Sequence, residues 1–239
     1  MDAPALASSE SDRYPRVASP VHTIVVLAAL GGWAFSAKIL ADQLRVAPNP
    51  NRVRLYLLTL LIEWIFFALV LIGVRRSGVS VFLVLGERWN SFRQVLRDIG
   101  IAAVFWIAAA MLLLLFGWLL RTSAQARNVQ FMLPHGRAET VLWIALSITA
   151  GICEETIFRG YLQRQFTSLT RSAPTGILLS AAAFGAAHAY QGFRMVILIA
   201  IYGSMFGVLA YWRGSVRPGM MAHAWQDSLG GLVGSLMRH

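Results

Sequence analysis

The sequence predicts an all-α protein that crosses a membrane several times, and three observations support this fold class. Hydrophobic residues fill 57% of the 239 positions and charged residues only 13%, so the chain is far more apolar than a soluble domain. The apolar residues gather in about seven stretches close to the length at which a helix crosses a bilayer. Most of the 21 basic residues lie at the ends of these stretches, where they would meet lipid head groups.

The predicted spans follow one another with short polar joints between them. They cover residues 22–41, 54–74, 98–120, 139–163, 175–191, 195–212 and 217–236. Turn-forming sequences such as Pro48-Asn49-Pro50 separate them. No small-residue cleavage site follows the first span, so we expect that span to be retained and not removed as a signal peptide. We divide the chain into a polar tail at 1–20, amino-terminal spans at 21–138 and a carboxy-terminal membrane core at 139–239.

Residues 75–97 do not fit the pattern of spans. Their apolar run, 79–85, is too short to cross a bilayer, and Arg88, Arg93 and Arg97 follow it. We expect this segment to be interfacial or re-entrant.

The formal net charge of +10 raises the question of a nucleic-acid partner. The arginines are scattered over many short loops and do not gather on one face, so we expect the lipid bilayer as the partner and no nucleic acid. Basic residues outside the spans are more numerous on the side of the amino terminus, which favours a cytoplasmic amino terminus. The protein is thus expected to be a multi-pass integral membrane protein.

A cluster of charges interrupts the fourth span. Glu154 and Glu155 are adjacent, and Arg159 follows. Each charge costs roughly 2.5–3.5 kcal/mol at the centre of a membrane helix, and such side chains usually mark a functional site. On an α-helix, positions 155 and 159 share a face, so Glu155 should pair with Arg159 and leave Glu154 free to meet water or substrate. The alternative is a buried ionic cluster that only packs helices.

Two further spans carry histidines. In the fifth, Phe184 and His188 lie on one face, and His188 is either a site residue or simply hydrogen-bonded to a backbone carbonyl. In the last, His223 and Asp227 are one turn apart, so Asp227 could fix the tautomer of His223. The alternative is a histidine near the membrane interface.

Together these residues predict a site that activates water. A water between Glu154 and His188 could lose a proton to the carboxylate and attack a carbonyl carbon, with His223 stabilising the oxyanion. One glutamate and two histidines could equally hold Zn²⁺ with an open water position. Both arrangements place a polarised water at the same point, so the spacing leaves the choice open.

The same residues resemble the signature of a known family, the CPBP intramembrane peptidases, which include the CAAX prenyl endopeptidases and bacterial bacteriocin-processing or self-immunity proteins. The family's first motif, a Glu-Glu pair followed by Phe, Arg and Gly, is met by Glu154, Glu155, Phe158, Arg159 and Gly160. Its second, Phe and then His four residues later, is met by Phe184 and His188. Its third, His and then Asn or an acidic equivalent, is met by His223 and Asp227. The resemblance covers roughly residues 139–236.

The resemblance implies a CAAX-protease-like helical fold and proteolysis at or within the membrane. Glu154 and His188 would activate the water, His223 and Asp227 would steady the oxyanion, and Glu155, Arg159 and Phe184 would support them. It favours a glutamic-type peptidase without a cofactor, with zinc as the alternative, in a bacterial inner membrane. The substrate would be a membrane protein or a lipidated peptide: a prenylated CAAX terminus, a leader peptide or an anchor segment. An ionised Asp227 cannot donate to an oxyanion as Asn would, which favours it as the residue that orients His223.

Two other residues have to be weighed. Cys153 adjoins Glu154, but adjacent side chains diverge by about 100° on a helix, so we interpret Cys153 as a packing residue and not as a nucleophile. Glu63 is a costly acid inside the second span that could line the cavity, and we leave it outside the catalytic set. Two other function classes stay open: a non-enzymatic immunity or scaffold protein, and a proton-coupled transporter that uses Glu63 and Glu154.

Overall fold

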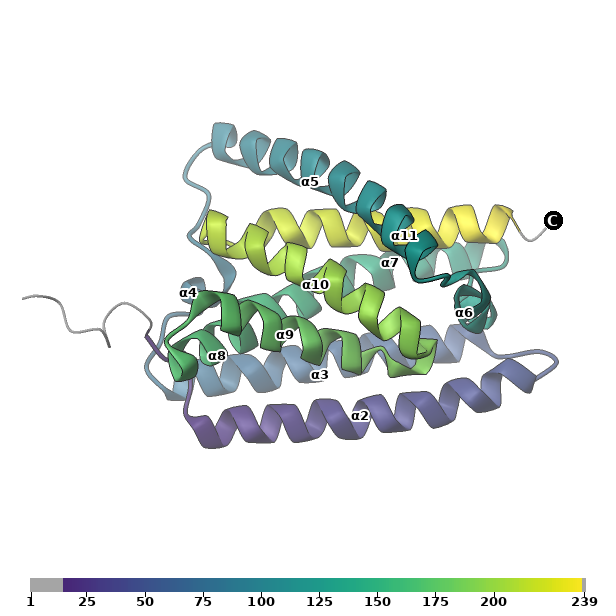
Figure 1. The fold of residues 1–239 in the computed structure, drawn as a ribbon, viewed down its shortest axis with the longest axis horizontal. Coiled ribbons are helices and arrows are strands. Elements are labelled where there is room, and N and C mark those ends of the chain that lie inside the picture. Colours follow the sequence, from purple (N-terminus) through teal and green to yellow (C-terminus); the bar gives the residue numbers. More distant parts are fainter. Residues whose placement is uncertain (1–14, 238–239) are drawn as a thin grey trace, which may run out of the picture.

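The computed structural model describes residues 15–237, without the side chains of Ala124 and Ala126, and forms a bundle of helices (Figure 1). Most of the predicted polar tail, residues 1–14, lies outside the described residues. The long helices are α2 (Pro20–Val46), α3 (Arg52–Arg76), α5 (Phe92–Leu119), α7 (Gly136–Glu154), α10 (Phe193–Arg213) and α11 (Arg217–Leu236). The shorter ones are α4 (Val81–Leu85), α6 (Ser123–Ala126), η1 (Arg127–Met132), η2 (Glu155–Leu162), α8 (Gln163–Thr170), α9 (Ala173–Ala187) and η3 (Ala189–Gln191). The predicted all-α, polytopic fold class is confirmed.

Each predicted span coincides with a helix, but the predicted number of spans is not confirmed. Five helices are long and apolar enough to cross a membrane: Pro20–Val46, Arg52–Arg76, Phe92–Leu119, Gly136–Thr170 and Phe193–Arg213. The two others fall short for different reasons. Helix α9 has only 15 residues, about 22 Å at 1.5 Å per residue, less than the roughly 30 Å of a bilayer core. Helix α11 has 20 residues, but it carries His223, Gln226 and Asp227 and is not apolar enough by composition.

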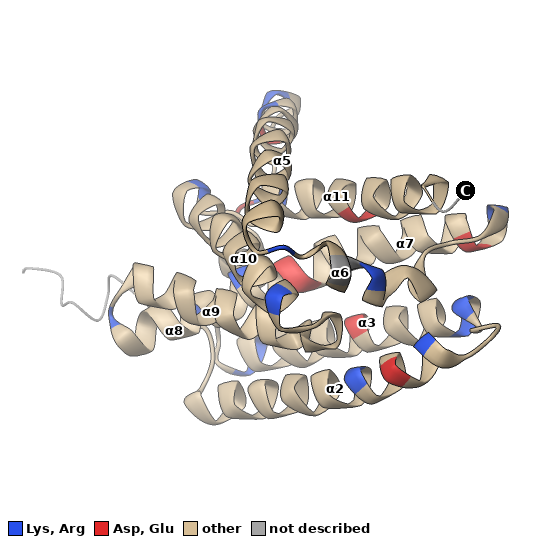
Figure 2. Ribbon diagram, turned by 45° about the vertical axis from the view of Figure 1, so that its right-hand side comes forward, with Lys and Arg blue, Asp and Glu red and all other residues tan. Residues whose placement is uncertain are grey.

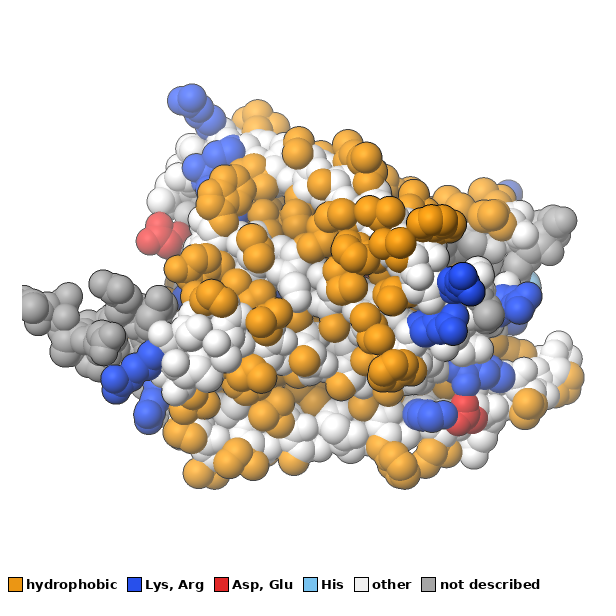
Figure 3. Space-filling view, in the orientation of Figure 1, with side chains coloured by type: hydrophobic (Ala, Val, Ile, Leu, Met, Phe, Trp, Pro, Cys, Tyr) orange, Lys and Arg blue, Asp and Glu red, His pale blue; other side chains and the backbone are white. Residues whose placement is uncertain are grey.

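The outer surface of the bundle suits a lipid environment. Hydrophobic side chains cover much of the face seen in Figure 3, and lysines and arginines gather toward its two ends. Large apolar residues such as Leu114, Trp118 and Phe193 are exposed. Figure 2 shows acidic positions part-way along α3 and α11, well inside the length of these helices. The chain is thus an integral membrane protein. Some of its acidic residues lie in the middle of its long helices and not at their ends.

The segment 75–97, expected to be interfacial or re-entrant, contains a short helix that packs inside the protein. Val84 on α4 is fully buried, and its carbonyl group lies directly over Gly160 of η2. A side chain at Gly160 would collide with that carbonyl, so glycine is what lets α4 approach. Helix α4 therefore packs against the part of the chain that carries the charge cluster.

Helix α2 is held at both of its ends. At its start, the Gln165 side chain accepts hydrogen bonds from the backbone N–H groups of Val17 (2.8 Å) and Ala18 (3.2 Å). At its end, Arg45 donates to the backbone carbonyls of Asn128 and Tyr190. The middle of α2 is left to form one wall of a cavity.

Candidate active site

The charge cluster lies at the junction of α7, which ends at Glu154, and a π-helix, η2, which continues α7 and carries Glu155 and Arg159. All eight residues of Glu155–Leu162 are buried. Within it the Arg159 Nη1 donates to Glu155 Oε1 at 2.9 Å, and each side chain is only 1% exposed. The predicted pairing of these two residues is confirmed. Turns of π-helix inside α-helices are frequently found at functional sites, and this one lies at the charge cluster.

The Arg159 guanidinium is enclosed by aromatic rings and backbone. Its Nη2 donates to the carbonyl of Gly203 at 3.2 Å, and its Cζ lies 4.2 Å from the centroid of the Phe184 ring and 5.3 Å from that of Phe206. A cation in this position gains from the negative faces of the rings as well as from Glu155. Phe184 thus packs against the charge cluster, next to the residues that it was expected to support.

His223 is oriented by Glu155, whereas the sequence had assigned that task to Asp227. The His223 Nδ1 lies 3.1 Å from Glu155 Oε1, which can only accept, so Nδ1 carries a proton. The other ring nitrogen, Nε2, lies 3.6 Å from Glu154 Oε2 and 3.5 Å from Asp227 Oδ2. Asp227 is therefore next to the reactive end of the ring. Its side chain is 38% exposed against 5% for His223, because it faces the cavity from one turn further along α11.

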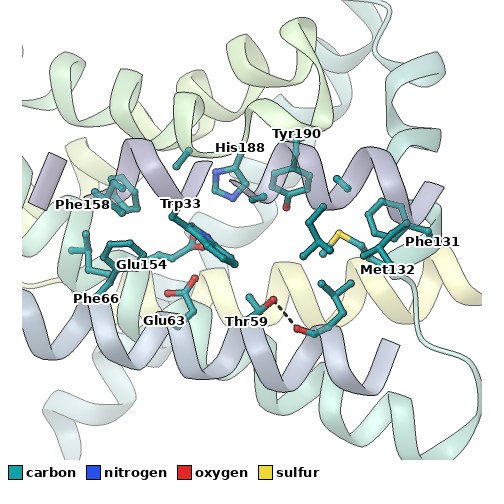
Figure 4. Close-up of a pocket in the computed structure, with 18 residues that line it drawn as sticks. Trp33, Thr59, Glu63, Phe66, Phe131, Met132, Glu154, Phe158, His188 and Tyr190 are labelled. Atoms are coloured by element: carbon teal, nitrogen blue, oxygen red, sulfur yellow. Dashed lines mark hydrogen bonds between the residues drawn. The ribbon is translucent and has the colours of Figure 1, made fainter. Parts of the chain in front are cut away.

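His188 is hydrogen-bonded to a backbone carbonyl and also lines the cavity, so both roles that the sequence allowed apply to it. Its Nδ1 is 2.8 Å from the carbonyl oxygen of Phe184, which fixes the proton on Nδ1. Nε2 is then left with a lone pair. Because α9 ends at Ala187, His188 lies at the end of the helix, where its ring points into a cavity together with Tyr190 (Figure 4). The backbone bond sets the tautomer that a base or a water-binding group needs.

Two chambers meet at these residues. One, of about 110 Å³, is lined mainly by apolar side chains of α2 and α3, among them Leu30, Trp33, Leu40, Leu44 and Phe66. The other, of about 370 Å³, is lined by His223, Gln226 and Asp227. Glu154, His188 and Tyr190 line both chambers. Glu154 Oε2 accepts no hydrogen bond in the part of the chain that the structure describes, so it is available to a water or a substrate.

The part of the chain that contains these residues is similar in sequence to a known protein family. Residues 136–229 match the family model of the Rce1-like type II CAAX prenyl endopeptidases. The matched stretch is less than half of the 239 residues, and it makes this part of the chain similar to that protease family. The similarity supports a CAAX-type intramembrane protease. Neither curated proteins nor solved structures gave a match to the chain.

The Rce1-like region runs from α7 into α11 and contains Glu154, Glu155, Arg159, His188, His223 and Asp227. The structure brings all six to one place. Their catalytic roles remain predictions. Cys153 lies beside the cluster but is fully buried in the core, as a packing residue would be.

One further acidic residue reaches the site from outside the Rce1-like region. Glu63, on α3, lines both chambers, and its carboxyl is directed toward Glu154 (Figure 4). The sequence marked Glu63 as a costly intramembrane acid but did not place it in the site. The depth of Glu63 in the membrane follows from its position in the sequence. The direction of its side chain depends on how α3 packs against α7, which the sequence does not show.

The sequence left zinc open as an alternative at this site. Among residues 15–237, no group of three His, Cys, Asp or Glu converges to hold a metal ion. Zinc needs at least three such ligands around one point.

Proposed function

We propose that the protein is an intramembrane endopeptidase that hydrolyses a peptide bond of a membrane-associated or lipidated protein with a water activated by Glu154 and His188. One observation carries this proposal: an unpartnered oxygen of Glu154 and the ring of His188, with a lone pair on Nε2, line the same cavity. A carboxylate and an imidazole lone pair can both accept a hydrogen bond from one water.

In the proposed reaction, Glu154 takes a proton from this water as its oxygen attacks the carbonyl carbon. The new C–O bond moves the carbonyl electrons onto the oxygen, which becomes an oxyanion. Glu154 then gives its proton to the leaving nitrogen as the C–N bond breaks, which leaves a carboxylic acid and an amine. The residue at this position therefore serves first as general base and then as general acid, with no covalent intermediate.

His223 is the group that we assign to the oxyanion. With Nδ1 held by Glu155, a proton on Nε2 would point to the region between Glu154 and Asp227. The buried Arg159 holds Glu155 in turn, so the donor is fixed before the substrate arrives. A donor oriented in advance in an apolar site stabilises developing charge far better than one in water. Asp227, an acceptor when ionised, would keep the proton on Nε2 in place.

The shape of the cavity supports an apolar substrate. The chamber between α2 and α3 offers leucine, tryptophan and phenylalanine side chains beside the reactive carboxylate. A prenyl group or an apolar segment would bury its surface there, which favours prenylated CAAX termini, with a leader peptide or an anchor segment as other substrates of the same chemistry. The proposal needs neither metal nor organic cofactor, has the bilayer and not nucleic acid as partner, and places the protein in a bacterial inner membrane.

Cleavage by purified protein tests the proposal. A prenylated peptide with a CAAX terminus, and a peptide carrying an apolar anchor segment, are incubated with proteoliposomes, and the products are identified by mass spectrometry. Wild-type protein should release one defined carboxy-terminal fragment. Glu154→Gln should release none, and Cys153→Ser should match wild type because that thiol is buried away from the cavity. Full cleavage by the Gln variant would contradict the mechanism, and binding without cleavage by wild type would favour a scaffold protein.

A further inference from the structure

We propose that Glu63 is a positioning residue of the active site, which shares one proton with Glu154 and thereby holds the catalytic carboxylate in place. The inference rests on the proposed function and extends it to a residue outside the Rce1-like region, 136–229. The site would then require α3 as well as the helices that carry the family's signature.

The placement of Glu63 comes from helix packing. Helix α3 packs along α7, and position 63 lies half-way along α3. Figure 4 shows the Glu63 carboxyl directed into the cavity, toward Glu154, from the side opposite His188. Glu63 is half-buried and lines both chambers at the point where they meet. Glu63 and Glu154 therefore face one another across the space in which the water is proposed to bind.

The chemistry of this contact requires a proton. Two ionised carboxylates can only accept hydrogen bonds, so Glu63 and Glu154, which face one another in the cavity, can bond to each other only if one of them carries a hydrogen. Two like charges that face one another in an apolar site also oppose double ionisation. The proposal therefore gives the pair one proton and one negative charge, an arrangement that aspartic proteases use with two aspartates.

The shared proton gives Glu154 a direct hydrogen bond. The nearest basic atom to Glu154 Oε2, Nε2 of His223, is 3.6 Å away, and the cationic Arg159 is bound to Glu155 instead. A carboxylic acid on Glu63 would orient Glu154 and keep a proton close to the bond that breaks. Loss of that contact would leave the catalytic carboxylate free to rotate, and a misplacement of about 1 Å can cost a factor of about 100 in rate.

Other groups that titrate also face this pair. They are His188 and Tyr190 from the end of α9 and η3, Tyr202 from α10, and His223 and Asp227 from α11, with the buried Cys153 next to Glu154 in the chain. Helices α2 and α3 contribute apolar side chains and Thr59 around the pair, with Glu63 as the acid. A comparison of variants at position 63 alone is therefore needed to separate the shared proton from the ionisation of these neighbours.

Two substitutions separate the hydrogen bond from the mere presence of a side chain. Glu63→Gln keeps the size and supplies an N–H donor to Glu154, whereas Glu63→Leu fills the space and supplies none. We expect Glu63→Leu to lower kcat by about 100-fold with KM changed by less than about threefold. We expect Glu63→Gln to keep kcat within about tenfold of wild type and to lose the alkaline ionisation step that the shared proton produces. Glu87→Gln, the same change at an exposed position, serves as the control.

The test uses full-length protein in proteoliposomes, with the prenylated CAAX peptide as probe and thermal unfolding of each variant measured in parallel. A Glu63→Leu variant with wild-type kcat overturns the proposal. So does a folded Glu63→Gln variant that is as inactive as Glu63→Leu, or one whose pH profile matches wild type. These comparisons apply only if wild type cleaves and Glu154→Gln does not.

A second readout does not depend on cleavage. Infrared difference spectroscopy of purified protein reports the carbonyl stretch of a protonated carboxyl group. The proposal predicts one such band that disappears in Glu63→Gln and is shifted or lost in Glu154→Gln, and remains in Glu87→Gln. A spectrum without that band, or a band that neither substitution alters, overturns the proposal even if the protease activity is confirmed. The band can equally be present in a protein that cleaves nothing. Failure of the proposed protease function can therefore be distinguished from failure of the proposal about Glu63.

Discussion

The buried pair of Glu155 and Arg159 gives the most demanding prediction of stability. Both side chains are 1% exposed, their closest atoms are 2.9 Å apart, and Arg159→Met would leave a carboxylate in an apolar core with only His223 as a donor. Removal of one partner from such a buried pair costs about 3–5 kcal/mol. In a chain of this size each kcal/mol shifts Tm by about 2–4 °C, so we expect Tm to fall by at least about 6 °C.

The single cysteine provides the assay. Cys153 is fully buried, so a thiol-reactive dye added to detergent-solubilised protein reacts only when the core opens on heating. The double variant Glu155→Gln with Arg159→Met removes both charges and should recover a large part of the loss, because no uncompensated charge remains. Lys38→Met breaks an exposed pair with Asp42 and should leave Tm unchanged.

Two results would refute the reasoning about this pair. The first is a Tm for Arg159→Met within about 2 °C of wild type, which would mean that water reaches Glu155 or that His223 alone compensates it. The second is a double variant as unstable as Arg159→Met, which would mean that packing of the long side chain and not charge was lost.

The remaining predictions concern the site. His188→Ala should lower kcat by about 10²–10⁴-fold, measured with the peptide substrate, and a loss below threefold would remove it from the mechanism. Asp227→Asn, which can donate to an oxyanion, should retain more activity than Asp227→Leu, and the reverse order of kcat would be inconsistent with a polar role at this position. Gly151→Ala would place a Cβ 2.6 Å from the Met220 carbonyl and push α7 from α11, so activity should fall, whereas unchanged kcat would show that the two helices can separate without harm. Elemental analysis should find no stoichiometric zinc and chelators should leave the rate unchanged; one zinc per chain, lost together with activity, would contradict this.

Much of the helical architecture could be predicted because it depends on local composition. The apolar stretches and the turn residues between them predicted seven segments, and each of these segments is helical in the structure. The number of spans was harder to predict, because α9 ends at Ala187 after 15 residues and α11 carries polar residues that belong to the site, His223 among them. The π-helix and the burial of α4 also depend on contacts between distant segments, such as that of Val84 with Gly160.

The site divides in the same way. The pair of Glu155 and Arg159 follows from helical spacing within one element, and the structure has it. His223 and Asp227 have the same spacing, yet the acceptor on His223 Nδ1 comes from another helix, because α11 packs against α7 with that ring facing η2. Spacing along the chain could not supply this contact, nor could it show that Glu63 faces Glu154.

The central claim is that Glu154 activates the water, and the most direct measurement is kcat for cleavage of one defined peptide by wild type and by Glu154→Gln in proteoliposomes. Because glutamine keeps the shape and cannot accept a proton, we predict a fall of about 10²–10⁴-fold in kcat with KM and Tm little changed. A Gln variant that is folded and cleaves within tenfold of the wild-type rate would contradict the account.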